Sequence, residues 1–126
     1  MPARIGNTCS LFAPAIMAVL LAFPGISLAC SGAEGKASFY CCEHHGRLTA
    51  SGERFDQNAM TAAMPARKHL GQRYRVTAGG KSVVVRITDT GGFAKYGRVI
   101  DLSRGAFAKL APTSKGVIRV CLERVG

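Results

Sequence analysis

Apolar and polar side chains alternate most clearly in residues 81–89, KSVVVRITD. Every second position from Val83 to Ile87 is apolar, and a period of two is typical of a strand with one buried face. The strand ends at Asp89. A glycine-rich loop then leads to a second short strand that ends at Asp101. We therefore expect residues 81–102 to form the centre of a β-structure with two acids at its rim.

Three further segments have the composition or the alternation of strands. GKASFY (residues 35–40) predicts a first strand, and Tyr74–Ala78 predicts a second one. Gly79 and Gly80 follow directly and predict a hairpin turn into the strand that begins at Lys81. Residues 117–125 predict the last strand. In it, the core side should hold Ile118, Val120 and Leu122, and the outer side Arg119, Cys121 and Glu123.

Two short helices are predicted between these strands. Asn58 is placed to cap a single helical turn over residues 59–63, which Pro65 would end. Ser103 is a favourable N-cap for a helix that ends at Pro112, with Ala106, Phe107 and Leu110 on one face. Strands joined by short helices in fewer than about 100 residues predict a small β-barrel with short crossover helices.

The first 29 residues have the pattern of a secretory signal peptide. Arg4 precedes the apolar run of residues 11–23, and Ser27-Leu28-Ala29 provides small residues for cleavage after Ala29. The run is shorter than the roughly 20 residues of a membrane span, so we expect no stable span after cleavage. The mature part, residues 30–126, is then one domain. A lipid on Cys30 is a further possibility, but we favour a periplasmic or secreted protein without it.

Charge narrows the class of partner. The chain has a net charge of +10, and removal of Arg4 with the signal peptide lowers it to +9. A basic exported protein suits an anionic wall or membrane surface. The basic residues are scattered and no aromatic–basic platform is present, so no nucleic-acid partner is expected. We expect a monomer.

Four cysteines remain after removal of the signal peptide: Cys30, Cys41, Cys42 and Cys121. An even number in an oxidising compartment predicts two disulfides. A bond between the adjacent Cys41 and Cys42 would be strained, so each is expected to bond to Cys30 or Cys121. The cysteines lack the usual C-x₂₋₄-C spacing of a zinc site, and His44 and His45 have no third ligand at suitable spacing. We expect no metal and no cofactor.

Six short motifs resemble, in the same order and at similar spacing, the rare lipoprotein A (RlpA) family. The motifs are GKASFY, HGRLTASGERFD, MTAA, YRVT-AGGKSVVVRITDTGGF, GRVIDLS-RGAFAKLA and GVIRVCLERV, and together they cover nearly all of residues 35–125. The resemblance implies a six-stranded double-psi β-barrel, a fold similar to that of expansins and family-45 glycoside hydrolases. It also suggests that the chain acts on the cell wall.

RlpA-like proteins include endolytic transglycosylases, which cleave peptidoglycan between N-acetylmuramic acid and N-acetylglucosamine. The sugar's own 6-hydroxyl attacks and forms a 1,6-anhydro product, so one carboxyl group can serve first as the acid and then as the base. The resemblance implies that Glu53 is this acid/base and that Asp56 is its neighbour. Asp89 and Asp101 resemble the acidic pair of expansins. With Tyr96, whose ring could stack on a sugar, they are the expected substrate-binding residues.

Each of these acids also has a purely structural interpretation. Glu53 in a turn is often only solvated, and Asp56 is a favourable cap for the next turn. Asp89 could accept loop amides in an Asx-turn, and Asp101 could stabilise a helix start. For Asp89 both roles can hold together.

The sequence departs from the family pattern at Met64, where the TAAH motif has its histidine. Methionine cannot exchange a proton, and His69, His44 or His45 could compensate only if the fold brings one of them to the site. Met64 therefore favours a second hypothesis, an expansin-like protein that binds glycan and loosens the wall without cutting it. A third hypothesis is a small disulfide-bonded structural or inhibitory protein.

Overall fold

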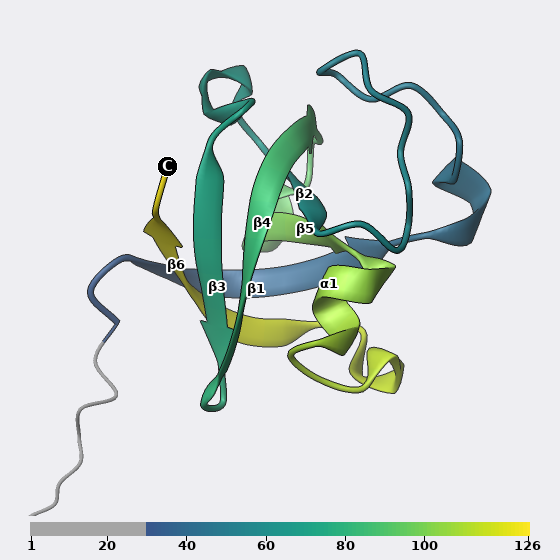
Figure 1. Cartoon of the computed structure of the whole chain (residues 1–126). Helices are drawn as coiled ribbons and strands as arrows, with labels where there is room; N and C mark the ends of the chain where they lie inside the picture. The colour runs from purple at the N-terminus through teal and green to yellow at the C-terminus, as the bar shows by residue number, and fades with distance from the viewer. Residues whose placement is uncertain (1–29) are drawn as a thin grey trace, which may run out of the picture.

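The computed structural model describes residues 30–126 (Figure 1), so the predicted signal peptide lies outside the described residues. Six strands close into a barrel in the order β1-β5-β2-β4-β3-β6, which confirms the predicted architecture. The strands are β1 (Ala33–Tyr40), β2 (Thr61–Met64), β3 (Arg73–Ala78), β4 (Lys81–Thr90), β5 (Arg98–Ser103) and β6 (Ile118–Arg124). The helical segments are η4 (Cys42–His44), η5 (Arg67–His69), η6 (Ala94–Tyr96), α1 (Arg104–Ala108) and η7 (Thr113–Lys115).

Alternating side chains from every strand fill the barrel. The fully buried strand residues include Val76, Val85, Ile87, Ile100 and Leu102, and Phe107 of α1 packs against them. β1 lies parallel to β5 on one side and antiparallel to β6 on the other, and this arrangement closes the sheet. In β6, Val120 and Leu122 are buried whereas Arg119 is exposed, as the alternation predicted. No helix of residues 30–126 is both long enough and apolar enough to cross a membrane.

The predicted turn and helix start near the ends of β4 and β5 are confirmed. Gly79 and Gly80 join β3 to β4 with φ angles of 54° and 83°, a left-handed conformation that glycine adopts without strain. The Ser103 side chain caps α1 by accepting a hydrogen bond of 3.1 Å from the backbone N–H of Ala106. These local signals were readable because each depends on one or two residues.

The helical turn predicted for residues 59–63 is wrong, because Thr61–Met64 form strand β2. Ala62 lies in register between Ile87 of β4 and Leu102 of β5 and is completely buried. Alanine favours helices in isolation, but pairing on both edges satisfies the backbone groups of this short segment. Tertiary context therefore overrides the local preference. β2 is thus the barrel strand that the sequence pattern does not predict.

The long connection between β1 and β2 extends from the barrel at the upper right of Figure 1, at the end away from the β3–β4 hairpin. Its tip contacts the end of β4, where the Ser51 N–H donates to the Thr88 carbonyl at 3.0 Å. Its returning segment contacts α1, where the Gly105 N–H donates to the Gln57 carbonyl at 2.8 Å. A Cβ atom at position 105 would lie 2.8 Å from the Asn58 carbonyl oxygen, so this close approach requires glycine.

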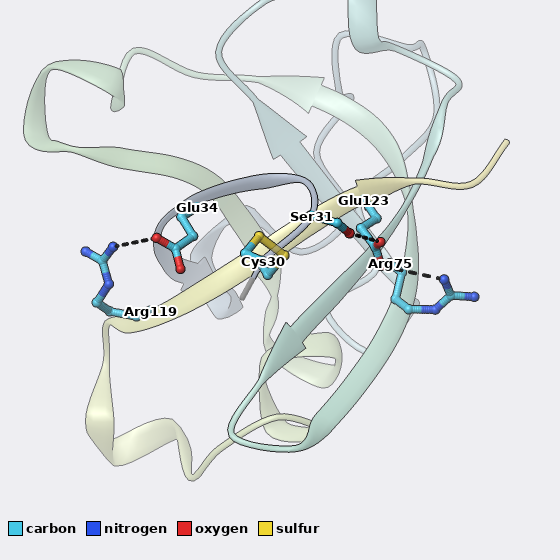
Figure 2. The surroundings of a disulfide bond; sticks show 7 residues. Cys30, Ser31, Glu34, Arg75, Arg119 and Glu123 are labelled. Carbon is cyan, nitrogen blue, oxygen red and sulfur yellow. Dashed lines mark hydrogen bonds and ion pairs between the residues drawn. A yellow bond between two sulfur atoms is a disulfide. The ribbon is translucent and has the colours of Figure 1, made fainter. Parts of the chain in front are cut away.

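One disulfide joins Cys30 to Cys121 and attaches the segment before β1 to the outer side of β6 (Figure 2). Polar contacts lie around it: Ser31 donates to Glu123 at 2.7 Å, and ion pairs of 3.9 Å join Arg75 to Glu123 and Arg119 to Glu34. Cys121 thus faces outwards and tethers an outer segment, as the alternation of β6 predicted.

The other disulfide joins the adjacent Cys41 and Cys42, so the expectation that each would bond to Cys30 or Cys121 is wrong. The reason is distance. β1 has 8 residues and separates the two ends, and a strand of that length spans roughly 26 Å. Cys30 already bonds to Cys121 at one end of β1, and Cys41 and Cys42 can reach only each other at the other end.

The two disulfides should differ strongly in their effect on stability. In the chain-entropy model, closing the 91-residue separation of Cys30 and Cys121 stabilises by about 4–5 kcal/mol, whereas joining adjacent residues contributes about 1 kcal/mol. We expect Cys30→Ser/Cys121→Ser to lower the urea midpoint far more than Cys41→Ser/Cys42→Ser. Urea denaturation followed by circular dichroism measures both. Equal losses in the two double variants would contradict this order.

Candidate functional site

Four neighbouring strands place four side chains in one row. The register pairs Ser38 of β1 with Asp101 of β5, Asp101 with Ala63 of β2, and Ala63 with Asp89 of β4. Paired residues on adjacent strands share a face of the sheet. Adjacent strands lie about 4.8 Å apart, so the Cα atoms of Asp89 and Asp101 are separated by roughly 10 Å. The two predicted acids of this row therefore face one site.

The row lies on the outer face of the barrel. Ile100 and Leu102 point into the core on either side of Asp101, so Asp101 points the opposite way. A pocket of about 270 Å³ opens here. The methyl group of Ala63 leaves the space between the two carboxyl groups open. The pocket is lined by Tyr40, His44, Ala63, Asp89, Thr90, Gly91, Phe93 and Asp101.

Asp101 is held by a chain of hydrogen bonds. The Arg98 guanidinium donates to Ser38 Oγ at 2.6 Å, and Ser38 Oγ donates to Asp101 Oδ1 at 2.8 Å. Because a guanidinium can only donate, the Ser38 hydroxyl directs its own hydrogen to Asp101. Oδ1 is thus an acceptor, and a proton on this carboxyl group resides on Oδ2.

Burial raises the pKa of Asp101, and the nearby charge of Asp89 adds to the rise. The hydrogen bond from Ser38 and the positive charges of Arg98 and His44 offset part of it. A carboxyl group whose pKa is raised by desolvation keeps its proton to a higher pH, as a general acid requires. Asp101 lines the pocket and has the raised pKa that a general acid requires.

Asp89 accepts hydrogen bonds from backbone amides and also lines the pocket. Its Oδ1 accepts hydrogen bonds from the backbone N–H groups of Ala50 at 3.0 Å and Thr90 at 2.9 Å. The first bond fixes the tip of the β1–β2 connection to the end of β4, and the carboxyl group also lines the pocket. Asp89 therefore shapes the wall of the site and contributes to its negative charge.

Tyr40 contributes an unpaired hydroxyl group to the same pocket. Its ring stacks on Phe55, with centroids 4.3 Å apart. Its Oη is buried and has no hydrogen-bond partner within residues 30–126. Burial and the charges of Asp89 and Asp101 raise the pKa of Tyr40, so it remains a donor. A buried donor without an acceptor is unfavourable, and a ligand oxygen in the pocket would relieve this cost.

Glu53 and Asp56 lie outside the pocket lining. Glu53 forms an ion pair with Arg86, whose Nη2 donates to Glu53 Oε1 at 2.9 Å. The hydrogen bond from Arg86 lowers the pKa of Glu53, and the side chain is exposed. Asp56 Oδ1 accepts from the Asn58 N–H at 2.8 Å, which is the turn-capping geometry considered for it. The structure thus does not bring these two acids together with Asp89 and Asp101.

Three other candidate residues lie in different places. Met64 is 8% exposed, packs in the core and lines a separate apolar recess with His69. His69 Nδ1 lies 3.0 Å from Tyr74 Oη, so this histidine does not replace Met64 in the acidic pocket. Tyr96 is 62% exposed and lines another recess with Lys36, Arg98 and Val117. The ring of Tyr96 is accessible to a sugar but lies outside the acidic pocket.

Sequence reasoning missed the parts of the site that depend on register. Ser38 and Ala63 have no chemical signature of their own, and their importance follows from the strands beside them. His44 is exposed, as expected for a residue in a turn, and it also lines the pocket, which its local sequence does not indicate. Within residues 30–126, no group of three or more histidine, cysteine, aspartate or glutamate side chains is placed to hold a metal ion.

Comparison with known proteins places the chain in a family. A model of the family described as "Lytic transglycolase" matches residues 32–122. A probable endolytic peptidoglycan transglycosylase RlpA of Synechocystis is 52% identical over 93 residues, covering 72% of this chain and 28% of that protein. The chain therefore spans less than a third of the length of that relative.

Two solved structures share the fold. The Streptomyces papain inhibitor aligns with a TM-score of 0.57 and 27% identity, over 74% of this chain and 96% of that one. An expansin of Clavibacter michiganensis in complex with cellohexaose aligns with a TM-score of 0.61 and 20% identity, over 74% of this chain and 50% of that one. These likenesses, with the closed six-stranded sheet, confirm the double-psi β-barrel.

The opposite pKa shifts of Asp101 and Glu53 predict opposite effects of pH on stability. Folding raises the pKa of Asp101 above 3.8, so the folded state loses stability as the pH rises between the unfolded and folded pKa values. Asp101→Asn removes this loss. We expect the variant to unfold at a higher temperature than the wild type at pH 7, and the difference to disappear below about pH 3.8.

Glu53→Gln provides the matched comparison. Because Arg86 lowers the pKa of Glu53, its stabilising contribution is present above its unfolded pKa and is lost as the pH falls. We expect this variant to unfold at a lower temperature than the wild type at pH 7 and at the same temperature in acid. Thermal unfolding followed by circular dichroism from pH 3 to 7 measures both variants. Shifts of the same sign in the two variants at pH 7 would be inconsistent with the geometry.

Proposed function

Because the chain belongs to the lytic transglycolase family, we propose that it is an exported protein that cleaves peptidoglycan as an endolytic transglycosylase. The observation that most supports this is the outer-face pocket, in which Asp101, with its pKa raised by burial, lies across Ala63 from Asp89. The substrate would be the bond between N-acetylmuramic acid and N-acetylglucosamine. The mature net charge of +9 supports association with the anionic wall, in the periplasm or outside the cell.

In the proposed reaction, Asp101 protonates the leaving glycosidic oxygen from its Oδ2, because Oδ1 is occupied by the Ser38 hydroxyl. The anomeric carbon then gains positive charge, which the Asp89 carboxylate is placed to stabilise. The 6-hydroxyl of the same sugar attacks this carbon, closes the 1,6-anhydro ring and gives its proton to a base that lines the pocket. No positioned water is needed, so the pocket does not require the wider spacing of an inverting hydrolase.

This proposal moves the acid role from Glu53 to Asp101. An acid must keep its proton near neutral pH, and Arg86 shifts the pKa of Glu53 in the unfavourable direction. Glu53 and Asp56 instead lie on the β1–β2 connection, outside the pocket lining. We propose that they contact the glycan chain beyond the cleaved bond. Tyr96, exposed beside Lys36 and Arg98, is proposed to contact it elsewhere on the surface.

A second candidate function is glycan binding without cleavage. It is favoured by Met64, since the histidine of the family motif is replaced by a side chain that is buried in the core. This candidate predicts that the protein sediments with peptidoglycan or cellulose and releases no product. The Streptomyces likeness suggests a third assay, inhibition of papain, for a protein that binds no glycan.

The decisive prediction concerns the products of residues 30–126. On intact or peptide-stripped peptidoglycan, we expect 1,6-anhydro-muropeptides detectable by mass spectrometry. Asp101→Asn should lower the rate by about 10²–10⁴-fold, the usual contribution of a general acid. Glu123→Gln is the control for the loss of one carboxyl group, because Glu123 lies on β6 outside the pocket, and it should retain the wild-type rate.

The alternatives give different results in the same assay. A loss in Glu53→Gln as large as that in Asp101→Asn, at unchanged stability, would restore Glu53 as the acid. Absence of anhydro product from every form of the substrate, together with co-sedimentation, would favour the binding function. Activity gained in Met64→His would show that the missing histidine limits the wild-type chain.

A further inference from the structure

One histidine reaches the acidic pocket, and it comes from the turn after β1 rather than from β2. His44 is the last residue of η4 and lines the pocket with Asp89 and Asp101. Its ring lies edge-on to Tyr40, with centroids 5.7 Å apart. His44 and Asp101 thus line the same pocket, and a positive charge on His44 lowers the pKa of Asp101.

The other two histidines of the chain are placed elsewhere. His69 lies in the apolar recess beside Met64 and contacts Tyr74 Oη and Gln72. His45 accepts a hydrogen bond at its Nδ1 from the Gln57 N–H at 3.2 Å, on the returning segment of the β1–β2 connection. His44 is therefore the only histidine among residues 30–126 that can exchange a proton inside the pocket.

The Cys41–Cys42 disulfide lies directly between β1 and His44. The chain turns sharply there: the His44 N–H donates to the Cys41 carbonyl at 2.8 Å, and the Arg47 N–H donates to the His44 carbonyl at 3.0 Å. The disulfide joins the two residues between Tyr40 and the turn, which removes backbone freedom at that point. The Tyr40 ring, fixed on Phe55, supports the imidazole from the strand side.

We propose that His44 is the catalytic base of the pocket and that the Cys41–Cys42 disulfide positions it. This proposal rests on the proposed transglycosylase activity. The neutral imidazole takes the proton from the attacking 6-hydroxyl while its oxygen bonds to the anomeric carbon. Asp101 gives its proton to the leaving oxygen, whose bond to that carbon breaks. Transfer of one proton from His44 to Asp101 then restores both groups, so no other reactant is consumed.

The proposal predicts a pH dependence that involves several groups. The groups that face His44 are Tyr40 from β1, Asp89 from β4 and Asp101 from β5, with Arg98 behind Ser38. His44 must be neutral and Asp101 protonated, so the rate should fall at both low and high pH. At low pH the rate falls because His44 is no longer neutral, and at high pH it falls because Asp101 has lost its proton. A histidine with a structural role alone would lower the rate equally at every pH.

The first experiment measures kcat/KM against pH for anhydro-product formation on peptide-stripped glycan strands. We expect His44→Gln to be about 100-fold slower and to lose the acid-side fall while keeping the alkaline one. His45→Gln, the adjacent exposed histidine, should keep the wild-type profile. An unchanged rate in His44→Gln, or a loss that leaves both sides of the profile intact, would overturn the proposal.

The second experiment tests the disulfide. Cys41→Ser/Cys42→Ser should lower the rate, and adding His44→Gln to it should give a protein no slower than His44→Gln alone, because both changes act through one side chain. Additive losses would show that the disulfide does not act through His44. Circular dichroism at the assay temperature confirms that each variant is folded.

A third experiment does not depend on turnover. In the Asp101→Asn variant, a tetrasaccharide of alternating N-acetylglucosamine and N-acetylmuramic acid is added and the histidine ring signals are followed by NMR. The His44 signals should move with the Asp89 amide, and those of His69 should not. Movement of the Asp89 amide without that of His44 would overturn contact between His44 and the sugar. A wild-type protein that gives no anhydro product, by contrast, would overturn the proposed function itself.

Discussion

The strand register that sets Ala63 between Asp89 and Asp101 is the constraint on which the site depends. Side chains alternate between the two faces of a strand, so a slip of one residue in β2 or β5 would exchange outer and core positions. Asp101 would then point into the apolar interior, and Leu102 would face solvent. The core residues on both sides of Asp101 hold this register. The packing of the barrel therefore also determines the geometry and the acidity of the pocket.

Much of the barrel was predictable because its strands have strong local signals. The alternation of β4, the double-glycine turn and the Ser103 cap each depend on a few neighbouring residues. β2 was missed because an alanine-rich segment resembles a helical turn until the two strands beside it are known. The same limit applies to the cysteines: the strain of an adjacent pair argues against a Cys41–Cys42 bond, but the length of β1 leaves these two cysteines no other partner.

The candidate site was predictable in part for a related reason. Asp89 and Asp101 follow recognisable strands, and the structure places them together in the pocket. The family resemblance drew attention to Glu53, but the effect of Arg86 on Glu53 depends on side chains 33 positions apart in the chain. His44 has an unremarkable loop sequence around it. Its place in the pocket depends on how the end of β1, the turn and the two acids are arranged in three dimensions.

The contact between α1 and the β1–β2 connection has a consequence for how such a pocket can diversify. Main-chain groups of the connection make these contacts. Gly105 packs against the backbone of Gln57 and Asn58, and the Ser103 hydroxyl donates to the Ala59 carbonyl. The hydrogen bonds of this contact go to backbone atoms of the connection rather than to its side chains. The residues that face a ligand can therefore change through evolution without rebuilding the support beneath them, whereas a side chain at position 105 would displace the whole wall at once.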